Sequence, residues 1–516
     1  MSLVETDLGR AERTHPESDQ RDRPRPELVV RAEQDRQRPG FHFVAPAGWL
    51  NDPNGVGEWG GVFHLFYQYN PEAAVHDRIR WGHATSTDLL RWHDEPIALT
   101  PSAGADAEGC WSGVLVDDNG TPTLVYSGHA PALGRTQNCC LATGTPDLTV
   151  WTKDAANPVI PGPPDGVDVT ELRDHAVWRE GEQWHQIMGS GLVGRGGALL
   201  HFSGPTLSNW TYQGALLVAD ELPTGGTFTG STWECPDLFA PEGHHTDRRV
   251  LVFSAWDNGL TLYPLYLTGR LSEDKFVPDG PARHLDLGLR HFYAPQSFTA
   301  ADGRRIQFGW SQEARPDAAA AEAGWSGVMS LPRTLTLAHD GTLLAAPVDE
   351  IEPLRIGTSE QLRVMSGRMQ METSGDQLDL VADVMIPPDG ALELAVRATE
   401  DLREATFVKL ERDARGTTRL TLDRSRSRLA SLTEGYDLTE LGGTLPTLVN
   451  DRVALRVLVD HSIVEVFANG VPLTARVYPA ETDAVGVRVS VHRSATANLT
   501  AWQMRDVRRG DNGDHN

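Results

Sequence analysis

Five apolar, strand-like runs recur along the first two thirds of the chain, and this repeat limits the possible folds more than any other feature of the sequence. Each run follows a turn signal, and each is preceded by a polar motif: "NDPNG", "CWSG", "RDH", "ECPD" and "FYAP". The motifs are centred on Asp52, Ser112, Asp174, Glu234 and Tyr293, with separations of 60, 62, 60 and 59 residues. Five units of this length, all made of strands, predict a five-bladed β-propeller.

The shared phase of the motifs predicts where their side chains lie. Equivalent positions of successive blades surround one axis, so Asp52, Asp174 and Glu234 are expected to converge at one end of the central channel. The alternative is that each acid is a separate loop residue facing water. Asn-Asp-Pro-Asn-Gly by itself is turn chemistry, but the common phase favours convergence.

The repeat ends after "GWSGVMSLPRTLTL", and alternating strands with polar turns follow, which predicts an antiparallel β-sandwich. Both ends of the chain are charged and offer little apolar surface to bury, so they are predicted to be disordered. The predicted all-β chain therefore divides into a disordered tail (1–38), a five-bladed β-propeller (39–338), a linker (339–358), a C-terminal β-sandwich (359–508) and a second disordered tail (509–516).

Composition excludes several classes of partner. The formal net charge of −25 argues against nucleic acid and against anionic membrane surfaces, whereas a neutral sugar is indifferent to it. No apolar run approaches the roughly 20 residues that span a bilayer, and no signal peptide is recognisable. The four cysteines form neither a disulfide framework nor a zinc pattern. We therefore expect a cytoplasmic protein, unless a secretion signal precedes this sequence.

Three converging acids can bind a hard cation such as calcium, hold a polar ligand, or divide nucleophilic and acid–base work. Asp52 lies among amides that favour its ionised form, and Arg173 is expected to keep Asp174 ionised. Glu234 lies between Trp233 and Cys235-Pro236, a drier setting that favours its protonated form. One ionised nucleophile, one protonated acid and one fixed acceptor are what a retaining glycosidase needs.

An ordered set of motifs resembles glycoside hydrolase family 32, which contains invertases, levanases, inulinases and related fructosyltransferases. The motifs are "GWLNDPNG", "FYQYNP", "WGHATSTDLLRW", "CWSG", "LRDH", "WECPDLF", "GWSGVMSLPR" and "DHSIVEVFANG", and the resemblance runs from about residue 40 to 508. It implies a propeller followed by a sandwich. It also implies retaining release of terminal β-D-fructofuranosyl units from sucrose or fructans through a covalent fructosyl-enzyme. We expect no cofactor and no catalytic metal, because Arg173 supplies positive charge beside Asp174 and the acids are needed for the chemistry.

The resemblance assigns roles to individual residues. Asp52 corresponds to the nucleophile, Glu234 to the general acid/base and Asp174 to the transition-state stabiliser. The positions that match substrate-binding residues are Asn51, Gln68, Trp81, Ser112 and Arg173, with Trp310 as a weaker match and Tyr293 placed by blade phase alone.

Two positions depart from the family pattern. His175 follows Arg173-Asp174 where the family usually has proline, and Trp111 precedes Ser112 where it usually has phenylalanine. We expect Trp111 to contact substrate. His175 either packs into its blade or reaches the pocket mouth near Glu234 or the leaving-group sugar.

Three other functions remain as alternatives to hydrolysis: fructosyl transfer to another sugar, non-catalytic fructan binding, and inverting hydrolysis by an arabinanase-like propeller. The presence of Asp52 and Glu234 in their motifs disfavours the last two, and no residue that we identify separates hydrolysis from transfer.

Overall fold

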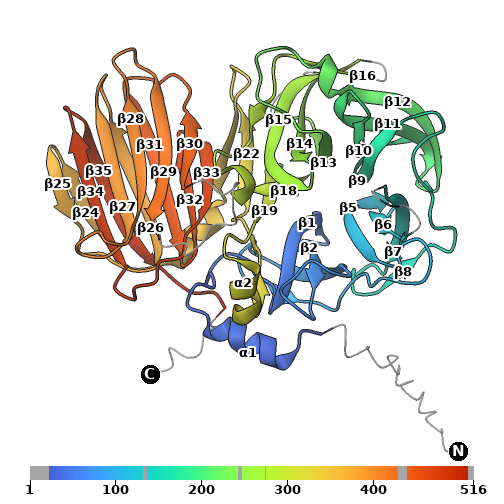
Figure 1. Ribbon diagram of the computed structural model, residues 1–516, viewed down its shortest axis with the longest axis horizontal. Coiled ribbons are helices and arrows are strands. Elements are labelled where there is room, and N and C mark those ends of the chain that lie inside the picture. The colour runs from blue at the N-terminus through green and yellow to red at the C-terminus, as the bar shows by residue number, and fades with distance from the viewer. Residues whose placement is uncertain are drawn as a thin grey trace, which may run out of the picture.

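The computed structural model describes residues 23–131, 134, 136–241, 247–272, 275–427 and 439–508. It contains two all-β domains side by side, a ring of five sheets and a two-sheet sandwich (Figure 1). The predicted five-bladed β-propeller followed by a β-sandwich is therefore confirmed.

The first three blades are antiparallel sheets whose strands run outward from the centre of the ring in chain order. Blade I contains β1 (Gly48–Trp59), β2 (Val62–Asn70), β3 (Arg80–Ser86) and β4 (His93–Asp94). Blade II contains β5 (Gly109–Asp118), β6 (Thr121–His129), β7 (Asn138–Gly144) and β8 (Trp151–Lys153). Blade III contains β9 (Val169–Glu180), β10 (Gln183–Leu192), β11 (Gly196–Thr206) and β12 (Asn209–Val218), followed by the 3-10 helix η3 (Ala219–Glu221).

The last two blades carry extra short strands. Blade IV contains β13 (Thr232–Phe239), β14 (Arg248–Asp257), β15 (Leu260–Ser272), β16 (Lys275–Pro278) and β17 (Arg283–His284), followed by η4 (Leu289–His291). Blade V contains β18 (Tyr293–Thr299), β19 (Arg305–Ser311), β21 (Val328–Met329), β22 (Arg333–Leu337) and β23 (Leu343–Pro347). Because β23 is the outer strand of blade V, the propeller extends beyond the predicted boundary at residue 338, into the segment predicted as a linker.

The ring is closed by contacts between successive inner strands, β1, β5, β9, β13 and β18, with β18 returning to β1. A short clasp strengthens this closure. Helix α2 (Asp317–Ala323) leads into β20 (Trp325–Ser326), which pairs in parallel with Gly48 and Trp49 at the start of β1. A segment that follows β19 thus completes the sheet of blade I.

The sandwich packs two six-stranded sheets face to face, and their apolar side chains form one core. The first sheet contains β24 (Arg355–Val364), β35 (Thr496–Met504), β26 (Gln377–Met385), β31 (Arg452–Asp460), β32 (Ile463–Ala468) and β33 (Val471–Arg476). The second contains β25 (Gly367–Gln370), β34 (Gly486–His492), β27 (Ala391–Ala398), β28 (Ala405–Arg412), β29 (Thr418–Arg426) and β30 (Glu440–Thr444). Only η5 (Asp349–Leu354) separates β23 from β24, so the sandwich begins a few residues earlier than predicted.

Part of the predicted N-terminal tail is structured. Helix α1 (Pro26–Gln34) begins with proline, which is well tolerated in the first helical turn. Its residues Leu28 and Ala32, one turn apart, are buried in a cluster with Trp325 and Ile463. Residues 1–22 and the predicted tail 509–516 lie outside the described part of the chain. Among the described residues, no helix has the length and apolar character that crossing a membrane requires.

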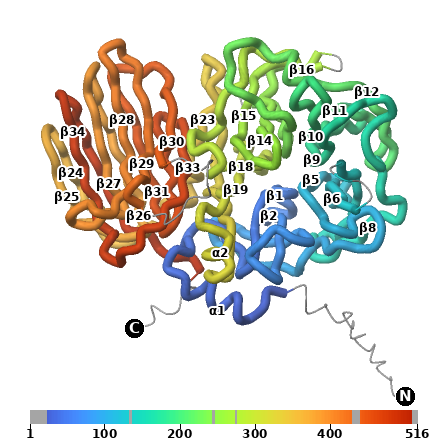
Figure 2. Tube along the Cα trace, in the orientation of Figure 1, coloured from blue at the N-terminus to red at the C-terminus, as the bar shows by residue number. Residues whose placement is uncertain are grey.

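A buried ionic network joins the two domains (Figure 2 shows β23 beside β33). Arg333 of blade V donates to Asp286 Oδ2 at 2.7 Å and to Glu465 Oε2 of the sandwich at 2.9 Å, and all three side chains are almost completely buried. Nearby, Asp460 of the sandwich accepts backbone N–H bonds from residues 40–42. These contacts fix the position of the sandwich on blade V.

Candidate active site

Each inner strand of the propeller carries a β-bulge at its polar motif. The pairing registers shift between Leu50 and Pro53, between Trp111 and Gly113, opposite Asp174, between Glu234 and Asp237, and between Tyr293 and Gln296. Bulges leave residues unpaired and redirect their side chains. Asp174 and Cys235 accordingly have positive φ angles of 59° and 46°.

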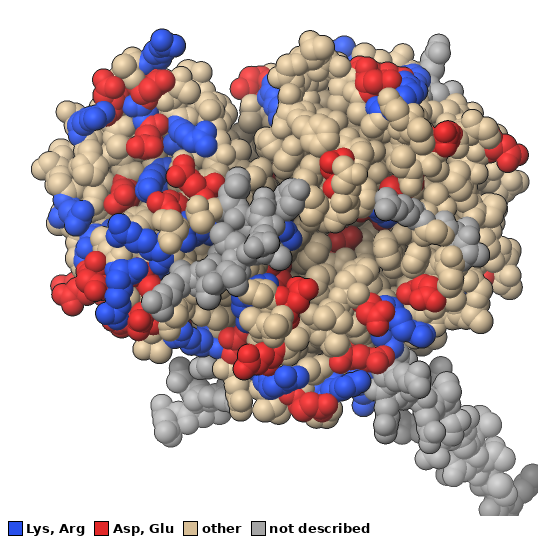
Figure 3. All heavy atoms as spheres, viewed as in Figure 1, with Lys and Arg blue, Asp and Glu red and all other residues tan. Residues whose placement is uncertain are grey.

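The bulges surround a hollow at the centre of the ring, and acidic atoms are visible inside it (Figure 3). Hydrogen bonds connect each blade with the next. They run from Ser112 Oγ to Asp52, from Asp174 N to Ser127 Oγ, from Cys235 N to Asp174 Oδ2, from Tyr293 OH to Glu234 Oε2, and from Val56 N to Gln296 Oε1. The motif residues are therefore held in one connected ring.

Asp52 is buried among donors, as its amide-rich motif predicts. Its Oδ2 accepts from Ser112 Oγ at 2.6 Å and from Gln68 Nε2 at 3.1 Å, and its Oδ1 accepts from Asn51 Nδ2 at 3.1 Å. Burial raises the pKa of Asp52 to about 6, and the Ser112 hydrogen bond opposes that rise. Asn51 is itself fixed, since its Oδ1 accepts from Trp49 Nε1 at 2.7 Å.

Asp174 lies beside Asp52, and Cys235 lies between them. Cys235 Sγ is 3.3 Å from Asp174 Oδ2 and 3.6 Å from Asp52 Oδ2. Burial and the nearby charge of Glu234 raise the pKa of Asp174 to about 7. Burial also raises the pKa of the Cys235 thiol well above its usual value, so this residue stays protonated. Sequence reasoning used Cys235 only as apolar context and missed this contact.

Glu234 is held by two donors from neighbouring blades. Its Oε1 accepts from Arg173 Nε at 2.9 Å, and its Oε2 accepts from Tyr293 OH at 2.5 Å. The setting of Glu234 is thus more polar than its sequence neighbours suggest. Arg173 also donates to Glu171 Oε2 at 2.5 Å, so it forms its ion pairs with two glutamates. Arg173 lowers the pKa of Asp174, as the sequence predicts, but burial and the charge of Glu234 raise it more.

Aromatic and imidazole rings line one side of the site. Trp49 lies 5.8 Å from Trp310 and 5.9 Å from His76, ring centroid to centroid. Trp111 lies 5.3 Å from His76 and 4.9 Å from His129. Burial lowers the pKa values of both histidines, so their rings are neutral near pH 7. Sequence reasoning identified Trp111 and Trp310 but missed the two histidines, which lie outside the repeated motifs.

Two predicted substrate-binding residues have other positions. The Trp81 side chain is fully buried, and its Nε1 donates to the Trp111 carbonyl at 3.0 Å, so it supports the site from the core. His175 is also buried, with Nε2 3.2 Å from Ser127 Oγ and Nδ1 3.1 Å from Gln186 Oε1. Neither ring has a surface to offer a sugar, and the hypothesis that His175 reaches the pocket mouth is wrong.

The described residues contain no group of three histidine, cysteine, aspartate or glutamate side chains arranged to hold a metal ion. The three acids are instead occupied by the donors described above. This arrangement suits acid–base and nucleophilic chemistry on a polar, uncharged substrate.

Family comparisons cover nearly the whole described chain. Residues 42–347 match the family model described as the glycosyl hydrolases family 32 N-terminal domain, and residues 350–503 match the family 32 C-terminal domain. The boundary between the two matches falls between β23 and η5.

Individual proteins give the same result. The chain is 33% identical to the sucrose-6-phosphate hydrolase of Escherichia coli over 466 residues, which covers 86% of this chain and 89% of that protein. It is 32% identical to the fructan 6-exohydrolase of Beta vulgaris over 543 residues, covering 92% and 88%. The crystal structure of fructan 1-exohydrolase IIa from Cichorium intybus superimposes with a TM-score of 0.78 at 27% identity, covering 92% of this chain and 98% of that one.

Proposed function

Because the chain belongs to glycosyl hydrolase family 32, we propose that it hydrolyses terminal β-D-fructofuranosides with retention of configuration, using Asp52 as nucleophile and Glu234 as general acid/base. The observation that supports this most is the convergence of Asp52, Asp174 and Glu234 from blades I, III and IV around Cys235. Retaining enzymes place nucleophile and acid about 5–5.5 Å apart, and this separation of Asp52 from Glu234 stays a prediction.

The first step needs one ionised carboxylate and one proton. Since burial and mutual repulsion raise the pKa values of Asp52 and Asp174, the three-acid cluster retains a proton near neutral pH. In the substrate complex we assign that proton to Glu234, which transfers it to the leaving-group oxygen. Asp52, with three donors on its carboxylate, attacks the anomeric carbon as the glycosidic bond breaks. Glu234 then takes a proton from the incoming water, which attacks the same carbon and displaces the Asp52 carboxylate.

Asp174 is suited to hold the fructosyl hydroxyl groups, because the Cys235 backbone N–H fixes its carboxylate and Cys235 Sγ links it to the carboxylate of Asp52. On the other side of the cleaved bond we place the leaving group against Trp49, Trp111, His76 and His129. These neutral rings offer flat faces to an uncharged sugar. The four cysteines are free thiols, consistent with a reducing, cytoplasmic compartment.

Product analysis tests the proposal. The protein is incubated with sucrose, sucrose 6-phosphate, short fructo-oligosaccharides, inulin and levan, and the products are separated by chromatography. Free fructose is expected, and retention predicts methyl β-D-fructofuranoside when methanol is present. Asp52→Asn should abolish release, whereas Asp118→Asn at the far end of β5 should not. No product from any fructoside would refute the proposal, and products dominated by longer sugars would show transfer instead of hydrolysis.

A further inference from the structure

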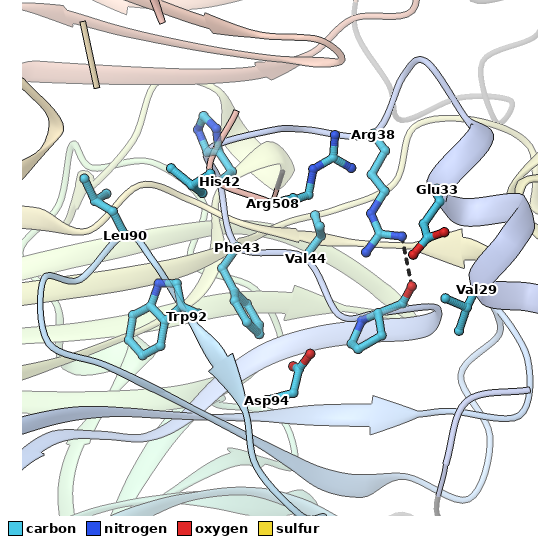
Figure 4. A pocket seen from close by; sticks show the side chains of 12 residues that line it. Val29, Glu33, Arg38, His42, Phe43, Val44, Leu90, Trp92, Asp94 and Arg508 are labelled. Carbon is cyan, nitrogen blue, oxygen red and sulfur yellow. Dashed lines mark hydrogen bonds between the residues drawn. The ribbon is translucent and has the colours of Figure 1, made fainter. Parts of the chain in front are cut away.

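A second cavity lies at the base of blade I, away from the central hollow. Its volume is about 470 Å³, and it is enclosed by α1, the chain that follows α1, the segment leading into β4, and residues 507–508 (Figure 4). A neighbouring cavity of about 710 Å³ shares Pro46 and Asp94 with it and continues to Trp151 of blade II. The two cavities therefore form one groove, and none of its lining residues belongs to the bulged motifs.

Arg38 and Asp94 differ in their access to this groove. Arg38 is buried, and its Nη1 and Nη2 donate to the carbonyls of Pro46 and Ala45 at 2.9 and 2.7 Å, so it is fixed in the wall. Asp94, which lines both cavities, is exposed. Its carboxylate is therefore available to a ligand.

The charges of the groove are balanced. Its lining contains two cations, Arg38 and Arg508, and two acids, Glu33 and Asp94 (Figure 4). Arg508 already forms an ion pair with Asp506 at 3.0 Å. A strongly charged ligand would be attracted either by the two arginines or by the two acids, and repelled by the residues of the other charge. A neutral ligand rich in hydroxyl groups can instead donate to the Asp94 carboxylate.

The walls between these polar groups are aromatic. Phe43 and Trp92 pack edge to face with centroids 5.8 Å apart in the smaller cavity, and Trp151 lines the larger one. Both tryptophans are partly exposed. Flat rings combined with a few convergent polar groups are typical of a small-molecule site, and both volumes lie within the range of about 300–1,000 Å³ for such sites.

We propose that this groove is a second, non-catalytic binding site for a neutral oligosaccharide, with Asp94 as its polar contact and Trp92 and Trp151 as its apolar faces. That the sugar is a fructosyl chain rests on the proposed function. A groove at the base of the ring would then hold a distant part of a long substrate while its end is cleaved in the central hollow.

Binding stoichiometry tests the proposal. Isothermal titration calorimetry uses a fructosyl tetrasaccharide and full-length protein carrying Asp52→Asn, which prevents turnover. Two sugars per chain are expected; adding Asp94→Lys should remove one of them, whereas adding Glu182→Ala, at an exposed position of blade III, should remove none. In the enzyme without Asp52→Asn, Asp94→Lys should raise KM for polymeric fructan relative to KM for the smallest substrate at least fivefold.

Hydrogen exchange provides a measurement that needs no substitution in the groove. The tetrasaccharide should slow amide exchange of residues 93–98 in the Asp52→Asn protein, which does not cleave it, and a malto-oligosaccharide of equal length serves as comparison. The proposed second site would be refuted if Asp52→Asn and Asp52→Asn/Asp94→Lys each bound one sugar per chain. Unchanged amide exchange at residues 93–98 would refute it as well. Binding that Asp94→Lys removes in a protein that cleaves no fructoside would refute the proposed function and support the groove.

Discussion

Replacing Asp52 by asparagine should make the protein more stable while abolishing catalysis. Asp52 is buried, and burial raises its pKa from 3.8 to about 6 despite three hydrogen-bond donors. The folded state therefore resists ionisation of this group more than the unfolded state does. Stability is gained as the pH falls through the folded pKa, and above pH 6 the ionised carboxylate destabilises the fold.

The size of the effect follows from the shift. A rise from 3.8 to about 6 corresponds to about 3 kcal/mol at pH 8, at 1.36 kcal/mol for each pH unit. The asparagine side chain carries no charge, so Asp52→Asn should recover most of that free energy. For a domain of this size, about 3 kcal/mol raises the Tm by roughly 6 °C.

Differential scanning calorimetry at several pH values checks the prediction. The difference in Tm between Asp52→Asn and the unsubstituted protein should be largest at pH 8, fall to about half at pH 5 and vanish below about pH 4. Asp118→Asn, at the outer end of β5, serves as the matched control and should show no such dependence. A less stable Asp52→Asn protein at pH 8, or a stabilisation independent of pH, would refute the reasoning.

Further predictions concern the proposed nucleophile, the domain interface and metal ions. Ser112→Ala should move the acid limb of the pH profile of kcat/KM up by about 1 pH unit, because a hydrogen bond to a charged group contributes about 1.5 kcal/mol. Ser112→Thr keeps the hydroxyl group and should leave the acid limb in place. An unmoved acid limb in Ser112→Ala would contradict this reasoning. Arg333→Met leaves Asp286 and Glu465 buried without their cation, so the free energy of unfolding measured in urea should fall by about 3–5 kcal/mol; an unchanged midpoint would contradict a stabilising interface. Dialysis against EDTA should leave the hydrolysis rate unchanged, and a loss that Ca²⁺ restores would contradict the absence of a catalytic metal.

The sequence was informative about the ring because a repeat has a phase. Closure of the propeller brings together the strands whose motifs share one phase, independently of the loops between them. These motifs are centred on Asp52, Ser112, Asp174, Glu234 and Tyr293. The family resemblance agreed with this reading. The sandwich was predictable from a different pattern, since alternation of apolar and polar residues indicates strands with one buried face.

The wrong predictions for individual side chains of the site have one physical origin. Side chains alternate between the two faces of a regular strand, but the extra residue of a bulge changes the face to which the following side chains point. Arg173 and His175 flank Asp174, yet Arg173 reaches Glu234 and Glu171, whereas His175 lies between Ser127 of blade II and Gln186 of blade III. No local sequence pattern predicts where a bulge makes this change. The burial of Trp81 could not be predicted either, because it depends on neighbours from another blade. Helix α1 was predictable in part, because Leu28 and Ala32 are spaced one helical turn apart.

The clasp between β20 and β1 has a consequence for synthesis of the protein on the ribosome. Gly48 and Trp49, which lead into Asp52, acquire their parallel partner only when Trp325 and Ser326 have been made. At roughly 5–20 residues per second, this interval lasts on the order of 15–55 s. Throughout it the nascent chain holds one edge of the first blade open, exposed to pairing with other chains and to chaperones. Asp52, the proposed nucleophile, is thus among the earliest parts of the site to be translated and among the last to be enclosed.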